Sequence, residues 1–219
     1  MNTTHECPRK LRGAAAAGLL DIGATAVDLR DAIAFGERHL AGSVHIKVKS
    51  PDFAARVLRF TPEVAPLLLI ADNKADANWA AGELAGKRSI AGYVDNVDML
   101  GIRWPLSQLA ALTPEDLHTR VKAGVETFIL DVREHNEWEQ GFIAGARHVP
   151  MNEVLDNLSE LPLDTPIAIT CAGGQRSSLI ASRLMANGFT QLFNVTGGMK
   201  AWAAARLPVD KKLYERASD

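Results

Sequence analysis

The sequence has few cysteines, few aromatic residues and no long apolar run. It contains two cysteines among 219 residues, Cys7 and Cys171, and two thiols so far apart do not build a disulfide framework. A reducing compartment suits them, so we expect a cytoplasmic protein. No stretch reaches the ~18 consecutive apolar residues of a membrane span. The alanine-rich segment 13–20 runs on without a small-residue cleavage site, which indicates an amphipathic helix rather than a signal-peptide core.

Neither positive nor negative charge dominates the sequence. The chain has 24 Lys and Arg against 26 Asp and Glu, a formal net charge of -2, and the basic residues form no run. Because proteins that bind nucleic acid or anionic membranes concentrate Lys and Arg in a patch or run, we expect neither partner. With 47% hydrophobic residues the composition is that of an ordinary globular protein, and the length suits two domains of about 100 residues each.

An internal repeat at a spacing of about 100 residues organises the chain. Thr113 and Pro114 lie at the join, where a capping Thr, a Pro in the first turn and two acids indicate the start of a new helix. The repeat predicts two copies of one domain, residues 1–108 and 113–219. The matched segments are 28–31 with 131–134, 40–46 with 143–149, 66–70 with 166–170, 95–97 with 193–195, and Trp104 with Trp202.

Short apolar strands alternate with helical segments in the second copy. This alternation predicts an α/β fold in which each domain has a mostly parallel sheet flanked by helices on both faces. Ligands of such sheets bind at the carboxyl ends of the strands, and Cys171 directly follows a predicted strand. The predicted strands are 128–132, 166–170 and 192–195, and the predicted helices are 134–140, 152–161, 177–186 and a last one that contains Trp202.

Cys171 opens a segment, Cys-Ala-Gly-Gly-Gln-Arg-Ser, that indicates a reactive loop. Gly173 and Gly174 permit a tight curl in which successive main-chain amides point inward and form an anion cradle. The helix beyond them adds the partial positive charge of its N-terminus. Both effects favour a thiolate, so we predict that Cys171 is a nucleophile. The alternative, a cysteine buried in the core, is not normally followed by Gly-Gly-Gln-Arg.

This loop resembles the active-site signature of the rhodanese family, in which Cys is followed by four residues, Arg, and then Ser or Thr. The segment 131–134 resembles the family's Asp-Val-Arg strand end. The segment 141–146 resembles its Gly-His-Ile-Pro-Gly-Ala turn, with departures at Phe142 and Ala144. The segment 194–202 is similar to its closing Gly-Gly-Met and Trp motif. The resemblance covers nearly the whole second copy.

The resemblance implies a sulfurtransferase that uses neither a metal nor a cofactor. The Cys171 thiolate would take the sulfane sulfur of a small anionic donor, thiosulfate or a low-molecular-weight persulfide, and pass it to a thiol or cyanide. A partner protein that handles persulfides is a further expected acceptor. The amides of the loop would hold the charged sulfur. The residues expected to bind substrate are Ala172, Gly173, Gly174, Gln175, Arg176 and Ser177.

Several roles stay open at this point. Arg176 either orients an anionic donor or forms an internal ion pair with Asp131. Ser177 either adds its hydroxyl to the cradle or caps the following helix, and we favour the cap. Asp131 and Arg133 are expected to support the loop rather than to react.

The first copy retains the repeated framework but lacks the nucleophile. Ala71 stands where the second copy has Cys171, and no glycine pair or matching Arg follows it. Asp72 and Asp76 would repel an anionic substrate. We therefore expect the first domain to be structural.

Three alternatives compete with the sulfurtransferase interpretation. Phosphatases and arsenate reductases of this architecture resemble rhodaneses but hold Cys and Arg with five residues between them, whereas four separate Cys171 from Arg176. A persulfide carrier or regulatory module for a partner protein would need the same cysteine. The mercaptopyruvate branch resembles this loop but lacks the Arg, so Arg176 counts against it.

Overall fold

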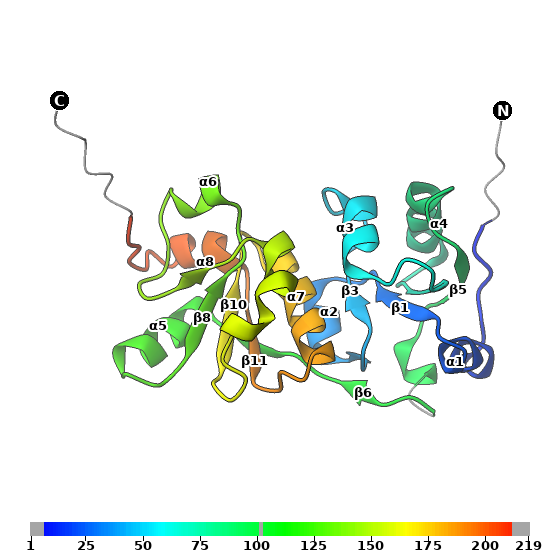
Figure 1. The fold of residues 1–219 in the computed structure, drawn as a ribbon, viewed down its shortest axis with the longest axis horizontal. Helices are drawn as coiled ribbons and strands as arrows, with labels where there is room; N and C mark the ends of the chain where they lie inside the picture. Colours follow the sequence, from blue (N-terminus) through cyan, green and yellow to red (C-terminus); the bar gives the residue numbers. More distant parts are fainter. Residues whose placement is uncertain (1–6, 101–102, 212–219) are drawn as a thin grey trace. The chain divides into compact units, whose positions relative to one another are not determined.

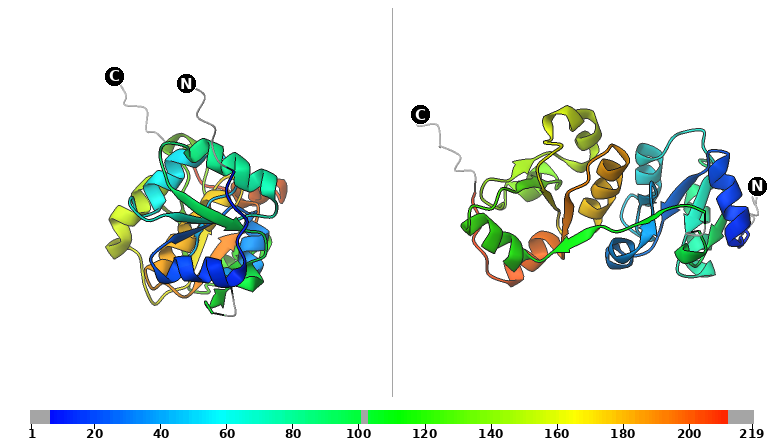
Figure 2. Two further views of the ribbon diagram at one scale, coloured as in Figure 1. Left: turned by 90° about the vertical axis from the view of Figure 1, so that its right-hand side faces the viewer. Right: turned by 90° about the horizontal axis from the view of Figure 1, so that it is seen from below.

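The computed structural model describes residues 7–100 and 103–211, and the chain divides into two compact units (Figure 1). The first unit holds the residues up to Ala110 together with the segment 182–187, and the second holds 111–181 and the residues from Gly188 onward. Each unit contains a mostly parallel sheet whose strands lie between helices (Figure 2). The predicted α/β class is therefore confirmed. Among the described helices, none combines the length and the apolar character that would let it cross a membrane.

The sheet of the first unit has the strand order β3-β1-β4-β5, and all of its pairs are parallel. Its central strand β4, Leu67–Ile70, is fully buried along its length, as a strand covered on both faces must be. The other strands are β1 (Thr25–Asp28), β3 (Val44–His45) and β5 (Ile90–Val94), with β2 (His39–Leu40) and β6 (Leu106–Ser107) paired separately. The helices are α1 (Gly13–Asp21), α2 (Ala32–Glu37), α3 (Phe53–Phe60), α4 (Lys74–Leu84) and the 3-10 turn η1 (Val97–Met99).

The sheet of the second unit has the order β7-β11-β10-β8-β9. Its helix α5 begins as predicted, because the Thr113 hydroxyl accepts a hydrogen bond of 3.1 Å from the Asp116 N–H. The strands are β7 (Ala110–Leu112), β8 (Phe128–Asp131), β9 (Arg147–His148), β10 (Ile167–Thr170) and β11 (Leu192–Val195). The helices are α5 (Pro114–Lys122), α6 (His135–Trp138), η2 (Met151–Glu160), α7 (Gln175–Ala186) and α8 (Gly198–Ala204).

The two sheets share one order over four strands, and β1 pairs with β4 in the same register as β8 with β10. The order β3-β1-β4-β5 in the first unit corresponds to β9-β8-β10-β11 in the second. Asp28 at the end of β1 lies opposite His45, and Asp131 at the end of β8 lies opposite His148. In each unit the histidine Nε2 is hydrogen-bonded to the main-chain oxygen of the arginine two residues after the aspartate, at 3.0 and 2.7 Å. The same polar frame therefore supports the carboxyl edge of both sheets.

Three predicted helices differ from the observed ones, of which the helix predicted over 134–140 is merely shorter, spanning His135–Trp138. The segment predicted as a helix over 152–161 is a 3-10 helix, Met151–Glu160, interrupted at Asn157, whose φ of -118° and ψ of 23° leave the helical region. The helix predicted from Ser177 begins at Gln175, one residue after Gly174. The earlier start of α7 places Ser177 in the first turn of the helix rather than at its end, beside Cys171.

Candidate active site

The loop after β10 places Cys171 at the carboxyl edge of the second sheet. All four residues of β10 are fully buried, since β8 and β11 pair with it on either side. Cys171 follows at once and is itself only 1% exposed. The loop closes within four residues, and α7 begins at Gln175. The predicted arrangement of buried strand, cysteine, short loop and helix is thus the one observed.

Two groups lie within hydrogen-bond distance of the Cys171 sulfur. The main-chain N–H of Gly174 donates to Sγ at 3.1 Å, and the Ser177 hydroxyl oxygen lies 3.4 Å from Sγ. Gly174 can donate from this position because its φ is 90°, in the left-handed region that favours glycine. A Cβ here would meet the Gly197 nitrogen at 3.4 Å, an ordinary contact distance, so the constraint on this position is its φ rather than its surroundings. The loop thus turns a backbone dipole toward the sulfur and favours negative charge there.

Asn194, on β11, fixes the orientation of the Ser177 hydroxyl. Its Nδ2 donates to the carbonyl of Gly174 at 3.2 Å, which leaves Oδ1 to accept the Ser177 hydroxyl at 2.6 Å. Both side chains are buried. Since the Ser177 hydroxyl donates to Asn194, its lone pairs face the Cys171 sulfur, 3.4 Å away. Ser177 therefore belongs to the surroundings of the sulfur, and the prediction that it caps the helix is wrong.

The amino end of α8 holds the first two residues of the loop. The N–H groups of Met199 and Lys200 donate to the carbonyls of Cys171 and Ala172, at 2.8 and 3.0 Å. Gly198 makes this approach possible, because its φ is 55° and a Cβ there would overlap the Cys171 carbonyl oxygen. Gly198, the second glycine of the closing motif, therefore lets the backbone of α8 contact the loop.

Arg133 and Asp131 form a buried ion pair at the end of β8. Asp131 is fully buried and accepts hydrogen bonds of 2.7–3.0 Å from the Arg133 guanidinium. The same guanidinium donates to the carbonyls of Glu137 and Gly141, both at 2.9 Å. It thereby ties the end of β8 to α6 and to the turn that follows. The contacts reach α6 and the turn rather than the Cys171 loop itself, so the role expected for the pair in supporting that loop stays a prediction.

Arg176 is paired with Glu137, and the predicted alternative of a pair with Asp131 is wrong. Two parallel hydrogen bonds of 2.6 and 2.7 Å join the guanidinium to the Glu137 carboxylate, 39 residues away. Asp131 is not available, because Arg133 already occupies both of its oxygens. The Glu137 carboxylate raises the pKa of Arg176, and the negative charges of Cys171 and Glu134 act in the same direction.

The Glu137–Arg176 pair predicts a pH dependence of stability. Hydrogen bonds from Arg176 lower the pKa of Glu137 from its ordinary value of 4.5, against desolvation, which raises it. A folded-state pKa below the unfolded value gives stability that is complete above about pH 4.5 and lost as pH falls through the folded value. In urea unfolding, we expect the advantage of the wild type over Glu137→Gln to be constant between about pH 7 and 5 and to narrow at lower pH. An advantage that widened on acidification would contradict the pairing.

The structure brings together Cys171, Gly174, Ser177 and Arg176, while other predicted residues lie further out. Gly173 is exposed at the tip of the loop, and Ala172 contributes its carbonyl to α8. Gln175 does not hydrogen-bond to the sulfur, and its buried Oε1 has no hydrogen-bond partner among the described residues. Three residues that complete the site, Asn194, Glu137 and Gly198, had no role assigned from the sequence. Each had a local signal: Asn194 is a polar residue in the last strand, Glu137 stands in a capping box, and Gly198 belongs to a Gly-Gly pair.

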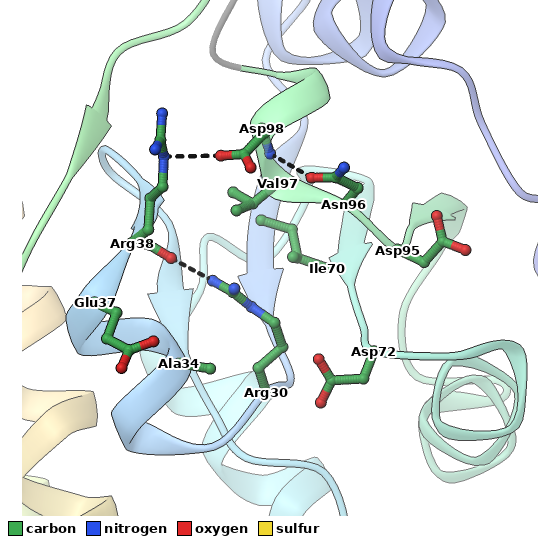
Figure 3. A pocket seen from close by; sticks show the side chains of 10 residues that line it. All are labelled: Arg30, Ala34, Glu37, Arg38, Ile70, Asp72, Asp95, Asn96, Val97 and Asp98. Atoms are coloured by element: carbon green, nitrogen blue, oxygen red, sulfur yellow. Dashed lines mark hydrogen bonds and ion pairs between the residues drawn. The ribbon is translucent and has the colours of Figure 1, made fainter.

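The corresponding edge of the first sheet carries a cavity of about 200 Å³ and no nucleophile (Figure 3). Ala71 stands at the position of Cys171, is buried, and is followed by α4 from Lys74. Asp72 lines the cavity as expected, but Asp76 does not, because Asn73 and Lys49 bind its carboxylate. The charged side chains around the cavity are Glu37, Asp72, Asp95, Asp98, Arg30 and Arg38.

Both arginines of this cavity are already engaged. The Arg30 guanidinium donates to Asp28 at 2.7 and 3.0 Å and to the Arg38 carbonyl at 2.6 Å, as Figure 3 shows in part. Arg38 forms an ion pair of 2.8 Å with Asp98. With its cations neutralised and carboxylates on its rim, this edge does not attract an anionic donor. The first unit thus retains the polar frame, and the expectation that it is structural stays a prediction.

The fold and the site define a class of α/β protein in which a loop between a buried strand and a helix cradles one cysteine. The family model of the rhodanese-like domain matches residues 113–205. A sulfurtransferase from Allochromatium vinosum is 34% identical over 95 residues, which cover 43% of this chain and 89% of that protein. The chain belongs to the rhodanese family.

Three further relatives differ in the share of their length that the chain covers. The thiosulfate sulfurtransferase GlpE from Pseudomonas putida strain KT2440 is 32% identical over 100 residues, which are 45% of this chain and 89% of that protein. The putative sulfur carrier protein YrkF from Bacillus subtilis is 34% identical over 96 residues, 44% of this chain. The chain spans only 52% of YrkF and 59% of YqhL, another Bacillus subtilis protein that is 39% identical over 74 residues, 34% of this chain.

Proposed function

We propose that the second unit is a sulfurtransferase that carries sulfur as a persulfide on Cys171. The observation that carries the proposal is the position of the sulfur, at the end of a buried strand and in contact with the Gly174 N–H and the Ser177 hydroxyl. Relatives named sulfurtransferase and thiosulfate sulfurtransferase support sulfur transfer as the type of reaction. The loop with four residues between Cys171 and Arg176 favours a single sulfur atom over a tetrahedral oxyanion.

The proposed reaction has two displacements. The Cys171 thiolate attacks the outer sulfur of the donor, a sulfur–sulfur bond forms, and the bond between the outer sulfur and the rest of the donor breaks. The bonding pair leaves with sulfite, when thiosulfate is the donor, or with a thiolate, when a persulfide is the donor. An acceptor thiolate or cyanide then attacks the outer sulfur of the Cys171 persulfide, and the Cys171 thiolate is restored. No external oxidant or reductant is needed.

The surrounding groups stabilise charge through these steps. The Gly174 N–H stabilises the thiolate before attack and the charged persulfide after it. When Cys171 is ionised, rotation of the Ser177 hydroxyl from Asn194 to the sulfur supplies a second donor. The amides of 172–177 form the rest of the cradle, and Arg176 presents the N–H groups that Glu137 does not use to the donor.

A persulfide carrier is the second candidate. The relationship to YrkF, a putative sulfur carrier, favours it over the phosphatase alternative. A carrier and an enzyme need the same persulfide and differ in how it is released. A carrier would deliver the sulfur to one protein partner, whereas an enzyme releases it rapidly to small acceptors.

Turnover in the presence of excess donor and acceptor tests the proposal. With thiosulfate and cyanide, and separately with a low-molecular-weight persulfide and glutathione, we expect many equivalents of thiocyanate or of transferred sulfur per protein chain. A single equivalent, followed by arrest, would favour the carrier. No transfer, together with hydrolysis of a phosphate ester, would overturn the sulfurtransferase assignment.

A further inference from the structure

We propose that Glu137 sets the donor preference of the Cys171 loop, by cancelling the charge of Arg176 and so favouring persulfides over the dianion thiosulfate. This inference rests on the proposed function and goes beyond it, because it names the class of donor and the residue that selects it.

The Glu137–Arg176 pair as a whole has no net charge, although Arg176 remains a hydrogen-bond donor. Glu137 binds both Nη atoms in the bidentate arrangement, and the two side chains are only 15% and 28% exposed, so solvent screens their interaction weakly. Glu137 is held in turn by α6, where its carboxylate also accepts the Glu134 N–H at 3.1 Å. The carboxylate is therefore a fixed part of the site, placed before any donor arrives.

Other charges near the loop do not restore a positive field. The guanidinium of Arg133 is bound to Asp131, and Glu134 is an additional acid close enough to influence Arg176. Lys200 touches the loop through its main-chain N–H, but its side chain is exposed and its charge is screened by solvent. A thiolate at Cys171 adds one more negative charge. Among the described residues, the side chains at the site therefore provide no surplus of positive charge for a doubly charged donor.

The lack of surplus positive charge at the site distinguishes the two classes of donor. Thiosulfate brings two negative charges to the loop and leaves as the sulfite dianion, whereas a persulfide carries at most one charge on its reacting end and leaves as a singly charged thiolate. Removal of one negative charge from the site improves the electrostatic energy of a dianion about twice as much as that of a monoanion. Glu137 therefore discriminates against thiosulfate even though it never touches the reacting sulfur.

The test compares two donors in three variants. The donors are thiosulfate and the persulfide of 2-mercaptoethanol, whose body carries no charge, with cyanide as acceptor. In Glu137→Gln, the ratio of kcat/KM for thiosulfate to that for the persulfide should rise by about tenfold. In Arg176→Gln, which leaves Glu137 unpaired, the ratio should fall. Glu126→Gln is the matched control, because this exposed acid precedes β8 at the opposite edge of the sheet, and its ratio should equal that of the wild type.

Each outcome has one interpretation. A ratio that stays within about twofold of the wild type in Glu137→Gln, or in Arg176→Gln if the first variant does not fold, would overturn the inference while leaving sulfur transfer intact. An equal rise in the Glu126→Gln control would also overturn it, because the effect would then come from overall charge. If the wild type transfers sulfur from neither donor, the proposed function itself fails.

Discussion

Replacing Cys171 with serine should lower sulfur transfer by a factor on the order of 10⁴ or more, the scale on which enzymes lose activity with their nucleophile. The substitution keeps the shape of the site and the contacts with Gly174 and Ser177, but a serine hydroxyl neither ionises at neutral pH nor forms a persulfide. The free energy of unfolding should change by about 1 kcal/mol or less, because the new oxygen occupies an already polar position. Steady-state thiocyanate formation and urea unfolding measure the two quantities.

Cys7 offers the matched control for this experiment. It is the other cysteine of the chain and is exposed. Cys7→Ser should retain wild-type transfer. If Cys7→Ser and Cys171→Ser lost activity equally, sulfur transfer would depend on both thiols, and the assignment of Cys171 as the single carrier would be contradicted.

The second large effect is expected at Gly198, where alanine should destabilise the second unit by roughly 2–5 kcal/mol. A residue with a Cβ at a φ of 55° costs about 1–2 kcal/mol, and the overlap with the Cys171 carbonyl oxygen adds about 1–3 kcal/mol. The overlap is with main chain, so a side-chain rotation cannot relieve it. If α8 moves away instead, the hydrogen bonds from Met199 and Lys200 are lost, and the loop loosens. Urea unfolding, followed by the fluorescence of Trp138 and Trp202, reports the change.

Gly173→Ala controls for the loss of any glycine near the loop. Gly173 is exposed, and a Cβ there would meet no other atom within 4 Å. Its stability should stay within about 0.5 kcal/mol of the wild type. A Gly198→Ala protein with wild-type stability and activity would show that the close approach of α8 does not hold the loop.

Much of the second unit was predictable because its strands are short, apolar and bounded by polar residues. The predicted strands 128–132, 166–170 and 192–195 correspond to β8, β10 and β11 within one residue at each end. The capping Thr113 was predictable because N-cap chemistry is local. The position of Cys171 followed from the same logic, since a residue directly after a buried parallel strand lies at the carboxyl edge of the sheet.

The errors arose where a local pattern left several partners open. Arg176 needs an acid, and Asp131 is the acid of the nearest motif, but Asp131 is already bound by Arg133 two residues further along. Arg176 pairs instead with Glu137, because α6 places that carboxylate beside it. No spacing in the sequence specifies the distance between these two residues. Ser177 has the chemistry of a helix cap, yet the left-handed Gly174 starts the helix two residues earlier and turns the hydroxyl toward the sulfur. Tertiary contacts therefore determine the partners of both Arg176 and Ser177.

Intact-mass spectrometry after incubation with a sulfur donor tests the central claim most directly. The purified protein is treated with thiosulfate, and separately with glutathione persulfide, beside the Cys171→Ser variant. We expect the wild type to gain one sulfur, about 32 Da, and the variant to gain none. Absence of the added sulfur from the wild type with both donors, or its presence on the variant, would contradict the account of Cys171 as the residue that carries sulfur.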